Sequence, residues 1–100
     1  MTINVRIKPD GTFVPVAIEK DPTDVIDIVV DYTQYFKTDT ITTATVTGEE
    51  ITIDSSAVAS NIVTIWISAG SANTQGEIKI IVSSSTRTLE RTLIVKVENK

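Results

Sequence analysis

The chain has no histidine and no cysteine. It therefore lacks the commonest general base, the thiolate nucleophile and the usual zinc ligands. The absence of cysteine also excludes disulfides, which suits synthesis in a reducing cytosol. Ser83-Ser84-Ser85 has no neighbours that would activate a hydroxyl, and the four glycines do not approach a phosphate-binding spacing. These absences predict a protein that is not an enzyme and holds no cofactor.

Basic residues are few, and long apolar runs are absent. Nine lysines and arginines stand against 13 acidic residues, so the formal net charge is −4, and the cations form no run. A nucleic-acid partner would require a basic face, so none is expected. No stretch approaches the roughly 18–20 apolar residues of a membrane span, and no membrane partner is expected. The first residues show no charged region followed by an apolar one, so no secretory signal is expected.

Leucine is also scarce, with two residues against 27 isoleucines and valines and sixteen threonines. β-Branched side chains restrict χ1, which a pleated surface accepts and a helix tolerates poorly. The composition therefore predicts an all-β protein. One hundred residues is a common size for a single domain, so we expect one domain over residues 1–100.

Alternating apolar side chains and turn signals mark out the strands. Seven or eight short strands are expected, at residues 3–7, 13–19, 24–32, 41–47, 51–53, 62–69, 78–82 and 89–97. Turn signals every 8–12 residues are typical of a β-sandwich or barrel. Residues 70–76 are expected to be a loop, and residues 54–61 to form at most one helical turn.

The first 20 residues have hairpin character. Pro9-Asp10-Gly11 supplies turn chemistry between two alternating segments. Pro15 cannot donate a ladder hydrogen bond, so it predicts a sheet edge or a bulge. Two roles for this segment are open: it completes the sandwich, or it reaches a neighbouring molecule as an assembly arm.

Four carboxylates, Asp21, Asp24, Asp27 and Asp31, are the nearest approach to a metal site. Clustered carboxylates suit calcium, a hard cation with oxygen ligands. On a strand, however, Asp27 and Asp31 would lie roughly 13 Å apart, too far to share an ion. A solvated strand face is the favoured interpretation, and no metal site is expected.

Trp66 and Arg91 each have two interpretations. Trp66 lies in the most apolar strand, which favours a place in the core of an interior strand over an exposed position in a binding surface. Arg91 stands in an apolar row of the last strand. It is either an interface anchor or the partner of a carboxylate such as Glu77 or Glu90, with its stem packed on the sheet.

Three segments in order resemble a family of small immunoglobulin-like bacteriophage structural proteins known as fiber-tail adaptors. The family begins with D-P-x-x-V-L-D, an aromatic pair and D-T-I, which are matched here at residues 21–27, 31–36 and 39–41. It continues with T-x-W-L-S-G-G, matched at residues 63–70. It ends with G-R-T-D-E-R-S and a closing strand, matched at residues 86–92 and 94–97. The resemblance spans residues 21–97. It departs from the family at Tyr35-Phe36, where the family often carries Trp, and in the added strands of residues 1–20.

The resemblance implies an immunoglobulin-like β-sandwich of about seven to eight antiparallel strands. It also implies a virion protein without an active site, assembled in the host cytoplasm in many copies or as a homo-oligomer. Its expected partners are phage capsid, portal or tail proteins. The expected role is that of a tail or fiber adaptor or of a capsid decoration protein, and the sequence does not separate these two roles. An N-terminal strand can augment a neighbour's sheet. The expected interface residues are Ile3, Val5, Ile7, Tyr35, Phe36, Arg87 and Arg91.

Two functions of other classes are weighed beside this one. A carbohydrate-binding module would use Trp66, Tyr32 or Tyr35 as a stacking platform, and it requires a solvent-exposed indole. A hydrolase using carboxylates alone would need two carboxyl groups about 5–10 Å apart in a cleft. A sandwich of this size has little room for such a cleft, so the enzyme ranks last.

Overall fold

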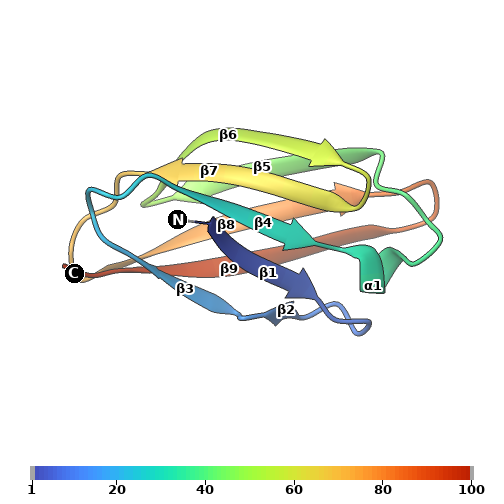
Figure 1. Cartoon of the computed structure of the whole chain (residues 1–100), viewed down its shortest axis with the longest axis horizontal. Coiled ribbons are helices and arrows are strands. Elements are labelled where there is room, and N and C mark those ends of the chain that lie inside the picture. The colour runs from blue at the N-terminus through green and yellow to red at the C-terminus, as the bar shows by residue number, and fades with distance from the viewer. Residues whose placement is uncertain (1, 100) are drawn as a thin grey trace.

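The computed structural model describes residues 2–99, which form two packed β-sheets and one short helix (Figure 1). The elements in chain order are β1 (Thr2–Ile7), β2 (Phe13–Val14), β3 (Ala17–Lys20), β4 (Ile26–Asp31), α1 (Thr33–Phe36), β5 (Thr43–Glu49), β6 (Thr52–Ala59), β7 (Ile62–Ser68), β8 (Thr74–Ser83) and β9 (Thr88–Val97). No helix in this part of the chain is long and apolar enough to cross a membrane.

The two sheets have the strand orders β2-β1-β4-β7-β6 and β3-β9-β8-β5. With β4, β7 and β6 as strands B, E and D and β5, β8 and β9 as C, F and G, this is the connectivity of an immunoglobulin constant-type sandwich. Two strands have no place in that scheme: β1, which lies between β2 and β4, and β3, which pairs with β9. The all-β sandwich predicted from the sequence is confirmed.

The expectation that all strands are antiparallel is wrong at two places. β1 runs parallel to β4, and β3 runs parallel to β9. The structure also has nine strands, where the sequence indicated seven or eight. Alternation of apolar side chains is the same in either strand direction, so it reports which face is buried and not how neighbouring strands run.

The core is built from the inward-facing β-branched residues of both sheets. In β4 the side chains of Ile26, Ile28 and Val30 are buried, and Ile65 and Ile67 of β7 lie beside them in register. β8 and β9 supply the opposite wall, with Ile78, Ile80, Val82, Leu93, Val95 and Val97 fully buried. Replacing one of these large side chains by alanine typically costs about 2–5 kcal/mol, since a cavity remains.

Two loop predictions are wrong. Residues 54–61 lie mostly in β6, an edge strand that pairs with β7 through a bulge between Ile53 and Ser55. Most of its side chains are exposed, so backbone pairing forms this strand without an apolar face. The loop expected at 70–76 ends at Asn73, and Gly76 lies inside β8. A Cβ on Gly76 would come within 2.3 Å of Ile51 Cγ1, which takes the space of a side chain there.

The first 20 residues cross from one sheet to the other. β1 and β2 form an antiparallel hairpin, with Arg6 opposite Val14 and Ile7 opposite Phe13. Pro15 then separates β2 from β3, and both of these strands lie at sheet edges, as the proline predicted. In this structure the N-terminal segment adds strands to both sheets.

Candidate interaction surfaces

One end of the sandwich collects the loops around the short helix, and we call it the α1 end. It consists of the loop 8–12, α1, the segment 37–42, the turn 60–61 and the turn 84–87, on the right in Figure 1. Two of the segments that resemble the phage family, 31–41 and 86–92, meet at this end.

Asp39 joins these two segments. Its carboxylate accepts hydrogen bonds from the hydroxyl of Ser84 at 2.8 Å and from that of Thr86. The Asp39 carbonyl oxygen accepts a bond from the Asn61 side chain at 2.8 Å, and Asn61 in turn accepts one from the backbone N–H of Ile41 at 3.0 Å. The bonds from Thr86 and Ser84 hold the pKa of Asp39 below its ordinary 3.8. The turn 84–87 is therefore fixed to the segment 37–42.

The aromatic pair of α1 divides between core and surface. Phe36 is buried, whereas Tyr35 is half-buried and packs edge-on against Phe36 with ring centroids 5.0 Å apart. Arg87 lies over the Tyr35 ring at 5.4 Å from its centroid and donates to the Tyr35 carbonyl oxygen at 3.1 Å. The exposed guanidinium is thus held in place by a cation–π contact and a hydrogen bond.

Arg91 pairs with main-chain oxygens, not with the side-chain carboxylates that the sequence suggested. Its Nε donates to the Gly11 carbonyl at 2.8 Å, and its NH1 donates to the Glu90 carbonyl at 2.8 Å. Gly11 has φ of +89°, and a Cβ there would lie 3.0 Å from an Arg91 nitrogen, so the loop 8–12 depends on this glycine. Arg91 therefore fastens the N-terminal hairpin to β9.

The opposite end of the molecule is organised around a buried lysine. The Lys20 side chain is 1% exposed, and its Nζ donates to the carbonyl oxygens of Ala69 at 2.6 Å, Asp21 at 2.8 Å and Pro22 at 3.4 Å. Burial lowers the pKa of Lys20 below 10.5, an effect that the neighbouring carboxylates oppose. Sequence reasoning missed this residue, because its acceptors are backbone atoms that leave no signal in the side chains. Here too, two family-like segments meet, at Asp21-Pro22 and at Ala69.

The prediction that Trp66 belongs to the core is wrong. Its strand β7 does lie inside its sheet, as expected, but only one face of β7 is buried. Ile65 and Ile67 point inward, so Trp66 points outward and is 42% exposed. It stands in register with Asp27 of β4 and Ser55 of β6 on the outer face of the five-stranded sheet. Tyr32 is buried and Tyr35 lies at the α1 end, so the three aromatics form no common platform.

The seven expected interface residues differ in burial. Val5, Ile7 and Phe36 are buried, so their side chains cannot contact a partner in this fold, and this part of the prediction is corrected. The physical reason is that alternation turns one face of β1 toward the core. Ile3 is half-buried against the core, and Tyr35 is half-buried at the α1 end. Arg87 and Arg91 are exposed.

Three of the four aspartates considered for calcium accept hydrogen bonds from other residues of the chain. Asp21 accepts from the Thr23 backbone and hydroxyl, Asp27 accepts from the Thr2 hydroxyl, and Asp31 accepts from the backbone N–H of Thr33. Within residues 2–99, no group of three His, Cys, Asp or Glu side chains is placed to hold a metal ion.

Comparison with known proteins gives one family. Residues 20–96 match the model of a family described as podophage GP4 fiber-tail adaptor protein gp77. The match leaves β1, β2 and most of β3 outside. No curated protein matches the chain.

Two solved structures can be superposed on most of this chain. A cysteine protease inhibitor, EhICP2, from Entamoeba histolytica has 14% identity and a TM-score of 0.48, with 99% of this chain and 97% of that chain covered. Amebosin has 14% identity and a TM-score of 0.38, with 84% and 88% covered.

Proposed function

Because this chain belongs to the podophage GP4 fiber-tail adaptor family, we propose that it is a non-enzymatic virion adaptor that binds tail or fiber proteins through its surface. The family match over residues 20–96 is the observation that carries this proposal, and it makes the chain a phage structural protein. The adaptor would be assembled in many copies in the host cytoplasm. The alternative virion role is that of a capsid decoration protein. The position of the protein on the particle distinguishes this role from that of an adaptor.

The hydrogen bonding of the family-like segments supports a binding role. Asp39 fixes the turn 84–87 at one end, and Lys20 fixes the loops at Asp21 and Ala69 at the other. The polar side chains of these segments are thus used to hold loops in one conformation. Loops that are fixed before binding lose little conformational entropy on contact with a partner, which favours association.

Trp66 marks the surface that we assign to the tail or fiber partner. We call this surface the Trp66 face and define it by Trp66, Ile62 and Val29 on the outer side of β4 and β7. A shallow depression beside it is lined by Asn4, Arg6, Val14, Asp31, Val29 and Ile62. Exposed tryptophans are frequent binding hot spots, since they bury a large area at low entropic cost, and the direct neighbours of Trp66 across the strands, Asp27 and Ser55, are polar.

The test uses a phage in which the gene for this chain is disrupted and then complemented. Particles made without the protein should retain heads and lack fibers in negative-stain images, and wild-type protein should restore the fibers. Trp66→Phe should restore them largely, whereas Trp66→Ser should not, although both variants should unfold at similar urea concentrations. Particles that keep their fibers without the protein would contradict the adaptor role. Full restoration by Trp66→Ser would contradict the Trp66 face alone.

The exposed indole also favours a second candidate, a carbohydrate-binding module that stacks a sugar ring on Trp66. This function predicts that acrylamide quenches the indole fluorescence and that an oligosaccharide shifts the emission and protects against quenching. Fluorescence emission that stays unchanged across a broad panel of glycans would count against this candidate. A protein partner would then remain as the ligand of the Trp66 face.

A further inference from the structure

Strand β6 has a free edge. It is the last strand of the five-stranded sheet, and among the described residues it pairs with β7 alone. Figure 1 shows β6 along the upper border of the molecule. In an antiparallel pair, the backbone groups of alternate residues point away from the partner strand. The outward N–H and C=O groups of β6 can therefore pair with a further strand.

The edges on the opposite side of the sandwich are protected against such pairing. There β2 has two residues and β3 has four, and Pro15, which has no N–H, lies between them. By contrast, β6 has eight residues without proline or lysine. Beyond the bulge between Ile53 and Ser55, its residues 55–59 keep a regular register with residues 62–66 of β7. Proteins usually block edges with short strands, prolines and lysines, so this part of β6 is open to pairing.

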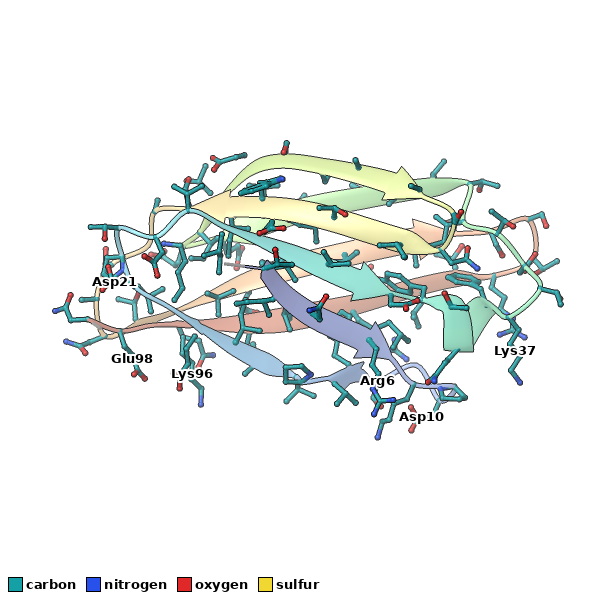
Figure 2. All side chains as sticks on the ribbon, viewed as in Figure 1. Arg6, Asp10, Asp21, Lys37, Lys96 and Glu98 are labelled. Carbon is teal, nitrogen blue, oxygen red and sulfur yellow. The ribbon has the colours of Figure 1, made fainter. Side chains whose placement is uncertain are left out.

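The surroundings of β6 are poor in positive charge. Residues 38–78 contain no lysine or arginine. The cations labelled in Figure 2, Arg6, Lys37 and Lys96, lie away from β6. Three carboxylates stand at the beginning of β6 and just before it, namely Glu49, Glu50 and Asp54. A strand that carries lysine or arginine at this end would be complementary in charge to the edge.

The inner side of this edge is apolar and partly uncovered. Val58 is in register with Val63 of β7, whose side chain is fully buried, so both side chains point toward the other sheet. Val58 is nevertheless 38% exposed. Ile53 of β6 and Val46 of the adjacent strand β5 are only half-buried against the core. An added strand would turn every second side chain toward this side and bury apolar surface there.

On the outer side, small residues separate the edge from Trp66. Ser55 lies directly opposite Trp66, and Ala57 lies opposite Thr64, the next outward residue of β7. Neighbouring strands lie about 4.8 Å apart, so an added strand would run about 10 Å from β7. A long side chain on that strand can meet the indole above Ser55, because the serine is too short to separate them. The Trp66 face and the edge of β6 are therefore continuous.

We propose that β6 accepts an extended segment of the tail or fiber partner as an added strand. This inference rests on the proposed function and names the way in which the partner binds. Among residues 2–99 the chain has no spare strand for this edge, because β1, the strand expected to reach a neighbour, pairs with β2 and β4. Backbone hydrogen bonds would supply affinity, and the side chains that meet Val58 and Trp66 would supply specificity.

Amide hydrogen exchange of the wild-type chain tests the proposal without any substitution. The probes are overlapping synthetic peptides of about 12 residues, longer than a typical strand, from the tail and fiber proteins of the same virion. At least one peptide should bind and slow exchange at every second residue between 55 and 59. This alternation is specific to strand addition, since contacts between side chains have no such period along the backbone. No binding by any peptide, or protection without alternation, would overturn the proposal.

Other occupants give different patterns of protection. Alternating protection of β5 in place of β6 would assign the partner to the other edge strand on this side and overturn the proposal. Alternating protection of β6 that appears without peptide as the protein concentration rises would identify a second copy as the occupant, and it would overturn the tail or fiber segment.

Two lysine variants test the choice of edge. Val58→Lys puts a charge on the inner side of β6 and should weaken binding of the peptide by about tenfold or more. Thr45→Lys puts the same charge on β5, the edge strand of the other sheet, and is the matched control that should leave binding nearly unchanged. Equal weakening in both variants would overturn the choice of β6. Urea unfolding checks that both variants fold, and the exchange pattern of the wild-type chain decides the matter if Val58→Lys does not.

The same variants separate this proposal from the adaptor role in the phage complementation test. Val58→Lys should fail to restore fibers, and Thr45→Lys should restore them. Restoration by both variants would overturn the added strand and leave the adaptor role intact. Particles that keep their fibers without the protein would contradict the adaptor role, whatever the peptides do.

Discussion

Arg91 and Gly11 are 80 positions apart in sequence, and the Arg91 Nε donates a 2.8 Å hydrogen bond to the Gly11 carbonyl oxygen. The bond connects β9, which lies within the family match, to the hairpin loop 8–12, which lies outside it. The added N-terminal strands are therefore tied to the part of the sandwich that matches the family by a side chain as well as by sheet pairing.

Arg91→Ala should destabilise the protein by about 1 kcal/mol, the usual net value of one such bond. Most of the effect should be local, so amide exchange of Gly11 should quicken more than that of β7. Arg91→Lys keeps the charge and lacks the Nε–H, so it should also lose protection in this loop. Unchanged exchange at Gly11 in both variants would show that the bond does not hold the hairpin.

Asp39→Ala should lower the urea midpoint, because the turn 84–87 loses its acceptor. The folded pKa of Asp39 is lowered by the Thr86 and Ser84 hydrogen bonds, so its contribution is complete above the ordinary value of 3.8 and is lost as pH falls through the lowered folded value. The difference between wild type and variant should therefore be full near pH 6 and shrink only below pH 4. Glu90→Ala serves as the control. A difference independent of pH down to pH 2 would contradict this role of the carboxylate.

Lys20→Met should destabilise the protein by about 2 kcal/mol, because three carbonyl oxygens lose a charged donor while the cost of burying the ammonium disappears. Burial lowers the folded pKa of Lys20, so the unfolded chain binds the proton more tightly. Wild-type stability should rise between the lowered folded pKa and 10.5, and the Met variant should lack this rise. Urea titrations from pH 7 to pH 10 measure both effects. Lys96→Met, on the exposed side of β9, should change stability by less than about 0.5 kcal/mol.

Tyr32→Phe should leave the free energy of unfolding unchanged or raise it by up to about 1 kcal/mol. The Tyr32 hydroxyl is buried with no hydrogen-bond partner in residues 2–99, and burial raises its pKa. The ring itself packs against Phe36 at a centroid distance of 6.0 Å and is retained in the variant. Phe36→Ala, which removes the packing, should cost about 3–4 kcal/mol. A loss above 1 kcal/mol in Tyr32→Phe would indicate a partner for the hydroxyl.

Strict alternation predicted the strands whose two faces differ most in burial. β1, β4, β8 and β9 were located within a few residues, because one face of each lies in the core. β6 was predicted only at its first residues, as a strand over 51–53, since the rest of this edge strand is held by backbone pairing and needs no apolar face. Trp66 was misplaced because β7 is apolar on both faces, and burial cannot then be read from composition.

The candidate surfaces were predictable only in part. Arg87 and Tyr35 were singled out through the resemblance to the phage family, and they contact each other. Lys20 and Asp39 were not singled out as individual residues, because partners far along the chain reveal their roles: Ala69 is 49 positions from Lys20, and Ser84 and Thr86 are 45 and 47 positions from Asp39. Long-range contacts of this kind depend on strand order, which local sequence patterns do not encode.

Quantitative mass spectrometry of gradient-purified virions tests the central claim most directly. The account predicts that this chain remains with the particles after washing in high salt, at a constant ratio to a tail protein from the same particles. The contact with a tail or fiber protein should persist in high salt. Absence of the chain from washed virions, or a ratio that varies between preparations, would contradict its role as a structural adaptor.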